Sequence, residues 1–267
     1  MNTLILKAAE LGQSLSLYGT INTVVGIISL LFSIWHAKKL GISLWKALII
    51  IFVIYEAIGL IQSLISPILS TIKDTHFLGI ETKVNSIVRV FIFLPLLAIP
   101  LARIFRLKWS LVCDAIALHP LLTSALAQIA CIFPGCCQGY EVNWGIYSVK
   151  TGQYHFPVQI LETILTLAVF SYLIYQLYRR KYTSNGMLYP EMMTLYGIAR
   201  FICEGLRDNE KIFLGCSAVA LHAFVLFAVG FGILLHKQHK EKTSTPTEET
   251  LPEDVAPPIE AEIEPAL

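Results

Sequence analysis

Long apolar runs constrain the fold of this chain more than any other feature. Several reach the roughly 17–25 residues that a helix needs to cross a bilayer, and 55% of all residues are hydrophobic against 15% charged. Hydrocarbon admits only helices and closed barrels, because these alone satisfy their own backbone hydrogen bonds. We expect an all-α polytopic membrane protein. Its seven predicted transmembrane helices cover residues 17–36, 45–65, 87–105, 109–133, 157–178, 186–203 and 218–236.

Basic residues gather in alternate connections between these predicted helices. They follow the first, third, fifth and seventh runs: Lys38, Lys39, Arg103, Arg106, Lys108, Arg179, Arg180, Lys181, Lys237 and Lys240. Loops rich in lysine and arginine stay in the cytoplasm. The pattern therefore predicts an amino terminus outside and a cytoplasmic carboxyl terminus.

The last 27 residues differ in composition from the rest. Residues 241–267 hold eight acidic residues and one lysine, with several prolines. Such a segment buries too little apolar surface to offset the entropy of ordering it. We predict a membrane domain over residues 1–240 and a disordered, acidic, cytoplasmic tail over 241–267. Solvation explains this tail better than a partner-binding role.

A polar stripe crosses the end of the sixth apolar run. Tyr196, Arg200, Glu204 and Arg207 are spaced by four, four and three residues, so they share one side of a helix. Charged side chains are costly in hydrocarbon and mark functional sites there. Arginine also presents a planar fork that binds phosphate or carboxylate in a bidentate manner. The stripe predicts an anion site at the outer membrane face, with a lipid phosphate as the natural ligand.

A second motif opens the fifth apolar run. Pro157 suits the first turn of a helix, and Gln159 and Glu162 follow on one face of that helix. Glu162 is expected about one turn inside the bilayer. Two hypotheses remain open at this point: the carboxylate pairs with an arginine of the polar stripe, or it helps to hold substrate.

Three cysteines, Cys131, Cys136 and Cys137, lie at the outer end of the fourth run. They can form a disulfide, for instance with Cys216, bind a metal as thiolates, or pack as small residues around a glycine turn. Packing is the favoured interpretation. Their spacing completes no zinc-finger-like tetrahedral set, so no metal site is expected.

Single polar residues within the apolar runs have ordinary structural explanations. Asp114 is interpreted as a helix-capping or packing group. His119 and His155 are the histidines nearest the predicted site, and both are interpreted as structural.

Taken in order, these motifs resemble those of the prolipoprotein diacylglyceryl transferases of bacterial membranes. The matching positions are Tyr18-Gly19, Gly135 and Gly139, the Pro157, Gln159 and Glu162 of a Pro-x-Gln-x-x-Glu motif, and the complete polar stripe. The chain departs from the family pattern elsewhere. It lacks a His-Gly-Gly segment in the third run, and Gln128, Cys131 and Cys136 stand where the family signature has an arginine, an asparagine and an acidic residue.

The resemblance implies transfer of a diacylglyceryl group from phosphatidylglycerol to the lipobox cysteine of a secreted precursor, at the outer face of the bacterial plasma membrane. Arg200 and Arg207 would stabilise the phosphate, Glu204 would orient their guanidiniums, and Tyr196 and Tyr18 would donate hydrogen bonds to lipid or thiol. Neither cofactor nor nucleic acid is implied; the partners are phosphatidylglycerol, the precursor protein and membrane lipid. The alternative is a non-catalytic protein of the same fold that binds an anionic lipid or a peptide. The remaining residues expected to bind substrate are Gln128, Gly135, Gly139, Gln159 and Glu162.

Overall fold

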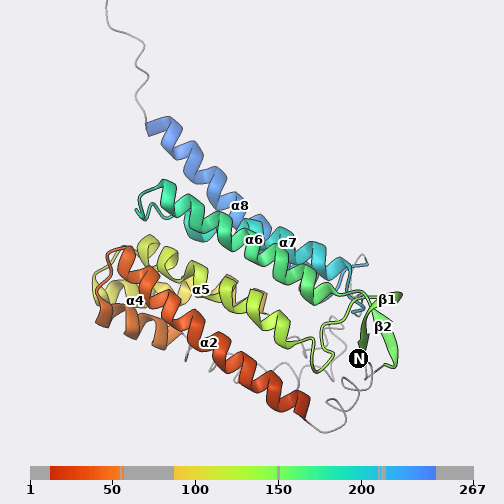
Figure 1. Ribbon diagram of the computed structural model, residues 1–267. Helices are drawn as coiled ribbons and strands as arrows, with labels where there is room; N and C mark the ends of the chain where they lie inside the picture. The colour runs from red at the N-terminus through yellow and green to blue at the C-terminus, as the bar shows by residue number, and fades with distance from the viewer. Residues whose placement is uncertain are drawn as a thin grey trace, which may run out of the picture.

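Helices make up most of the molecule (Figure 1). The computed structural model describes residues 13–54, 56, 87–148, 151–209, 211 and 215–244. The main helices are α2 (Gln13–Lys39), α4 (Ile87–Phe105), α5 (Trp109–Ala130), α6 (Val158–Arg179), α7 (Leu188–Gly205) and α8 (Ala218–Ser244), and a shorter apolar helix covers Leu44–Ile54. A two-stranded antiparallel sheet of β1 (Glu141–Ser148) and β2 (Gln153–His155) joins α5 to α6.

Four helices are long and apolar enough to cross a membrane. They cover Ser16–Lys39, Trp109–Ala130, Val158–Arg179 and Ala218–Lys240. The helical, membrane-spanning class expected from the sequence is confirmed, and these four helices coincide with predicted spans. Helices also occupy the predicted spans 87–105 and 186–203, as α4 and α7. Residues 55 and 57–65 of the predicted span 45–65 lie outside the described residues, and so does the whole tail beyond Ser244. The count of seven spans and the domain boundary therefore stay predictions.

The helix α5 is the centre of the bundle. It packs against α2, α4, α6 and α7 (Figure 1). Most of its side chains are buried, and small residues such as Ala115, Ala117 and Ala125 alternate with larger ones such as Leu118 and Leu121. Small side chains let neighbouring helices approach closely, as helix packing in membranes requires. The helix α5 therefore fixes the positions of α6 and α7, from which the polar side chains come.

The helices α7 and α8 approach closely at two glycines. A Cβ on Gly197 would lie 2.7 Å from the backbone nitrogen of Phe227, and one on Gly230 would lie 2.8 Å from that of Thr194. Neither position can hold a larger residue without moving a backbone. This contact holds α7, with its two charged residues near the carboxyl end, against α8.

Asp114 fixes the opposite end of α7. Its carboxylate accepts hydrogen bonds from the backbone amides of Gly186 at 2.8 Å and Tyr189 at 3.2 Å, and from the Ser184 hydroxyl at 2.8 Å. The first amides of a helix have no partner within it and form its positive end. The predicted capping role is confirmed, although the capped helix is α7 rather than the helix that carries Asp114.

Candidate functional site

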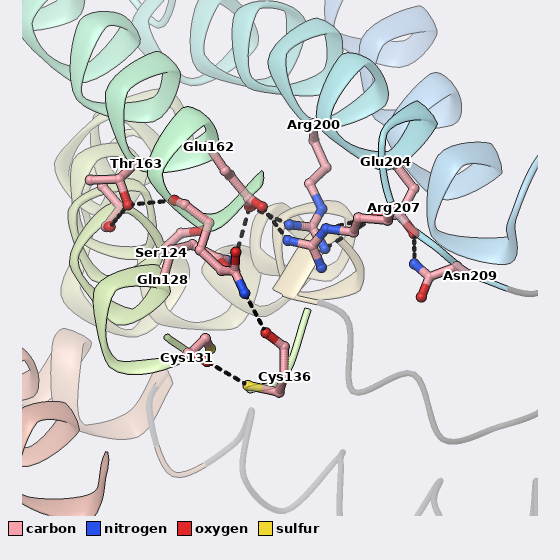
Figure 2. Close-up of polar contacts among 12 residues, drawn as sticks. Ser124, Gln128, Cys131, Cys136, Glu162, Thr163, Arg200, Glu204, Arg207 and Asn209 are labelled. Carbon is pink, nitrogen blue, oxygen red and sulfur yellow. Dashed lines mark hydrogen bonds and ion pairs between the residues drawn. The ribbon is translucent and has the colours of Figure 1, made fainter. Parts of the chain in front are cut away.

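The carboxylate of Glu162 lies at the centre of a buried polar cluster (Figure 2). It comes from the second turn of α6 and accepts hydrogen bonds from both arginines of α7 and the loop after it: Arg200 Nη1 donates to Oε1, and Arg207 Nη2 donates to Oε2. Gln128 of α5 also donates to Oε1, at 3.1 Å. Of the two hypotheses for Glu162, the structure shows the pairing, and with two arginines rather than one.

Glu204 lies between the same two guanidiniums. Its Oε2 is 3.5 Å from Arg200 Nη2 and 3.7 Å from Arg207 Nε. Its Oε1 accepts hydrogen bonds from Ser217 at 2.9 Å and from Asn209. The two carboxylates thus hold the two arginines from opposite sides, as Figure 2 shows.

The cluster is buried and electrically balanced, yet it keeps unused hydrogen-bond donors. Glu162 is 1% exposed, Arg200 6% and Arg207 4%, and the two arginines and two glutamates carry equal and opposite formal charge. Within the described part of the chain, Nε of Arg200 and Nε of Arg207 have no hydrogen-bond partner, and neither has Oε2 of Glu204, which lies 3.7 Å from Arg207 Nε. A buried donor without a partner costs about 1–3 kcal/mol. An oxygen-rich anion is the ligand that such donors would bind.

Tyr196 and Tyr18 have different surroundings. Tyr196 is fully buried one turn before Arg200, and its hydroxyl forms a 3.0 Å hydrogen bond with Ser124 of α5. Its ring packs edge-on against Phe91 of α4. Tyr18, on α2, lies on the thiol side of the site, where it interacts electrostatically with Cys131.

The three cysteines predicted at the outer end of α5 come together in space. Cys131 directly follows α5, and the Sγ atoms of Cys131, Cys136 and Cys137 all lie within 4.8 Å of one another. Gln159 donates a 2.8 Å hydrogen bond to the carbonyl of Cys136 and so attaches this loop to α6. The turn needs Gly135, whose φ is +66°. All six cysteines of the chain are free thiols, so the disulfide considered from the sequence is not formed in this structure.

The positive charges of the two arginines influence the thiol cluster. Hydrogen bonds from the thiols of Cys131 and Cys136 lower the pKa of Cys137 below its ordinary value, and the positive charges of Arg207 and Arg200 act in the same direction. Both effects favour the thiolate form of Cys137.

Gly139 attaches the thiol loop to both neighbouring elements. Its amide donates to the carbonyl of Phe156 at 3.3 Å, it pairs as a β-bridge with Arg207, and the next amide, of Tyr140, donates to the carbonyl of Leu206 at 3.2 Å. A Cβ at Gly139 would lie 2.6 Å from the Phe156 carbonyl oxygen. Only glycine fits here, and the contact places the thiol loop beside Arg207.

The two histidines interpreted as structural have structural partners. His155 is buried and bonds the carbonyl of Gly139 at 2.8 Å and the Thr151 hydroxyl at 2.7 Å. His119 bonds Ser33 of α2 at 2.8 Å, which joins α5 to α2. These contacts agree with a structural role for both histidines.

Three polar residues of the cluster were not predicted: Ser124, Asn209 and Ser217. Ser217 precedes α8 and accepts a 3.2 Å hydrogen bond from the amide of Ala220, which makes it a helix cap recognisable from a serine before an apolar run. Its second bond, to Glu204, depends on the contact between α7 and α8 and has no sequence signal.

Comparison with known proteins gives the same family that the motifs indicate. A family model described as "Prolipoprotein diacylglyceryl transferase" matches residues 7–236. The chain is 26% identical over 144 residues to phosphatidylglycerol–prolipoprotein diacylglyceryl transferase 2 of Clostridium perfringens, a match covering 51% of this chain and 55% of that protein. It is 29% identical over 89 residues to the phosphatidylglycerol–prolipoprotein diacylglyceryl transferase of Streptococcus uberis, covering 33% of this chain and 34% of that protein. The matched segments thus span about half and about a third of these relatives.

Proposed function

Since this chain belongs to the prolipoprotein diacylglyceryl transferase family, we propose that it transfers a diacylglyceryl group from phosphatidylglycerol to the cysteine thiol of a secreted lipoprotein precursor. The observation that carries the proposal is the buried pair of arginines, whose Nε atoms donate no hydrogen bond within the described residues. Such a pair suits the phosphate of the donor lipid, because guanidiniums bind phosphate oxygens in pairs of hydrogen bonds.

The reaction is a displacement at carbon. The acceptor thiolate attacks the glyceryl carbon, a sulfur–carbon bond forms, and the carbon–oxygen bond to phosphate breaks with its electron pair remaining on the phosphate. Negative charge therefore grows on a phosphate oxygen, which Arg200 and Arg207 stabilise. Glu162 and Glu204 hold both guanidiniums in place beforehand, so little rearrangement accompanies the reaction.

The other predicted site residues divide between the two substrates in this proposal. Gln128, bonded to Glu162, lies on the lipid side, with its own Oε1 lacking a hydrogen-bond partner among the described residues. Gly135, Gly139 and Gln159 shape the thiol loop on the acceptor side. Tyr18 donates to lipid or thiol. Tyr196 can do so only by exchanging its hydrogen bond to Ser124 for one to substrate.

We place the protein in the bacterial plasma membrane with seven spans, an outer amino terminus and a cytoplasmic tail. The four long apolar helices and the alternate basic loops support this placement. The arginine cluster then lies at the outer face, where a secreted precursor carrying a lipobox arrives.

A mass-shift assay tests the transferase directly. Purified protein in phosphatidylglycerol vesicles is incubated with a lipobox peptide, and the thioether-linked diacylglyceryl peptide is measured. Arg200→Ala should lower the rate by about 10²–10³, the usual loss for one oxyanion-stabilising donor. Arg180→Ala is the matched control, because Arg180 forms an ion pair with Glu191 at the other end of α6. No product from the unaltered protein, while a known family member works in parallel, would overturn the transferase proposal.

The alternative function, binding of an anionic lipid or a peptide without chemistry, has one observation in its favour. The arginine charges are fully balanced by Glu162 and Glu204, and the nearby Gln128 is uncharged. Phosphatidylglycerol binding that depends on Arg207, together with no thioether product, would establish this alternative.

A further inference from the structure

The thiol cluster, Cys131, Cys136 and Cys137, has the donor set of a metal site. Spacings of five and one residues match no zinc-finger pattern, which is why the sequence predicted none. The turn through Gly135 and Cys137, with φ of +66° and +60°, reverses the chain and returns two thiols to the end of α5. The three Sγ atoms then lie within 4.8 Å of one another.

We propose that Cys131, Cys136 and Cys137 bind Zn²⁺ as three thiolates, and that the acceptor thiol of the precursor occupies the fourth position. The second half of this inference rests on the proposed function, whereas the metal site itself does not. Zinc–sulfur bonds of about 2.3 Å in a tetrahedron place the sulfur atoms about 3.8 Å apart. Side-chain rotation that brings the thiols together by about 1 Å at most satisfies this geometry.

The number of ligands distinguishes an open site from a closed one. Structural zinc sites have four protein ligands, whereas catalytic ones have three and an exchangeable position. In the part of the chain that the structure describes, the thiol cluster includes no fourth histidine, cysteine or carboxylate. Its partial exposure leaves room for a ligand from outside.

The surroundings suit a negatively charged metal–thiolate centre. Three thiolates and one Zn²⁺ leave one net negative charge, and Arg207 and Arg200 interact electrostatically with Cys137. The loop is also held in position from outside the ligand set, by the bonds of Gln159 to Cys136 and of Gly139 to Phe156. Such supporting contacts fix metal ligands in productive geometry.

A metal at this site would explain how the acceptor thiol loses its proton. The two carboxylates of the arginine cluster are committed to guanidiniums and are poorly placed to accept it. A thiol that binds Zn²⁺ releases its proton to solvent. The bound thiolate attacks the glyceryl carbon, the phosphate leaves with the electron pair of the broken carbon–oxygen bond, and the thioether product, a weaker ligand, dissociates. Zinc keeps its oxidation state throughout.

Cobalt substitution tests the metal site without any lipid. Full-length protein in detergent, reduced and stripped with a chelator, is titrated with Co²⁺. We expect one equivalent to bind, with sulfur-to-cobalt charge-transfer bands and the visible bands of tetrahedral Co²⁺, both abolished by one equivalent of Zn²⁺. Cys137→Ser should weaken these bands, whereas Cys216→Ser, a half-exposed cysteine outside the cluster, should leave them unchanged.

A lipobox peptide then tests the fourth position. The peptide should shift the charge-transfer bands, and the same peptide with serine in place of cysteine should not. Absence of the bands in folded protein, their persistence in both Cys136→Ser and Cys137→Ser, an unshifted spectrum, or a disulfide between Cys131 and either neighbour in protein isolated without reductant would each overturn the inference.

The two proposals fail in different ways. If metal-free protein makes the thioether product at the full rate, the metal has no role in activating the acceptor thiol and the transferase stands. The Co²⁺ titration alone decides whether the metal site exists. If cobalt binds and the thiol peptide shifts its spectrum but no thioether forms with phosphatidylglycerol, the transferase proposal is wrong.

Discussion

Glu162 is the residue on which the geometry of the arginines depends. Among the described residues, it is the one side chain hydrogen-bonded to Arg200, Arg207 and Gln128. Each bond comes from a different segment of the chain: α5, α7 and the loop after α7. Its negative charge therefore holds together the lipid-phosphate side of the proposed site.

Glu162→Gln keeps the size of this side chain but removes its charge. Two buried guanidiniums would then share one carboxylate, and breaking a buried ion pair costs about 3–5 kcal/mol. We expect a lower unfolding temperature in detergent and a loss of transfer of about 10²–10³. Glu191→Gln is the control, because Glu191 pairs with Arg180 alone, at the other end of α6, and the two side chains are 16% and 26% exposed. Removing this less buried charge should cost less stability than removing that of Glu162. Equal stability losses in the two variants would contradict the central role of Glu162.

The sequence predicted this cluster only in part. Spacings of four and three residues placed Arg200, Glu204 and Arg207 together because helix periodicity is local. The choice of Glu162 between pairing and substrate binding was open, since it depends on how α6 lies against α7. The bond from Ser217 to Glu204 could not be predicted either, because it depends on how α7 lies against α8.

Gly139→Ala tests the attachment of the thiol loop to Arg207. The new Cβ would lie 2.6 Å from the Phe156 carbonyl oxygen and 3.0 Å from that of Leu206, both in backbone that cannot move freely. We expect a stability loss of about 1–3 kcal/mol, as for other overpacked sites, and reduced transfer. Gly205→Ala is the matched control, because nothing lies within 4 Å of its added Cβ. Thermal unfolding and the mass-shift assay measure both effects, and an unperturbed Gly139→Ala protein would rule out the attachment.

Among the elements, the helices follow from the sequence and the β1–β2 hairpin does not. Apolar runs of membrane length satisfy their backbone hydrogen bonds by forming helices, so α2, α5 and α6 were predicted within a few residues. The helix α8 begins at Ala218 as predicted but continues past the predicted end at 236 to Ser244. No strands were predicted between the fourth and fifth helices. Pairing there depends on an irregular register between Glu141 and Ile146 opposite His155, which no alternation of residues indicates.

Gly197→Ala tests whether the contact of α7 with α8 positions the site. The added Cβ would lie 2.7 Å from the amide nitrogen of Phe227 and 2.9 Å from the carbonyl oxygen of Ala223. The two helices must separate to admit it, so we expect a loss of about 1–3 kcal/mol in stability and weaker transfer. Gly232→Ala, on α8 with open space around its Cβ, should be neutral. A Gly197→Ala protein as stable as the Gly232→Ala protein would show that the close approach is not required.

At the scale of the whole molecule, the proposed site and the basic loops lie at opposite ends of the bundle. The arginine cluster and β1–β2 share the end where α6 begins and α7 ends (Figure 1). Lys39 at the end of α2, Arg103 near the end of α4 and Arg179 at the end of α6 lie toward the other end. The order of the helices thus agrees with the alternation of charge from which the orientation was predicted.

Protease access in intact cells tests this orientation. A cleavage site inserted at Gly152, in the exposed turn between β1 and β2, should be cut from outside, because the hairpin lies at the end with the site. A cleavage site added after Leu267 should be protected until the cells are opened, because loops rich in lysine and arginine remain in the cytoplasm. Cleavage of the tail but not of the hairpin would show the opposite orientation, with the arginine cluster at the cytoplasmic face. A secreted precursor could not reach it there, so that result would also contradict the proposed acceptor.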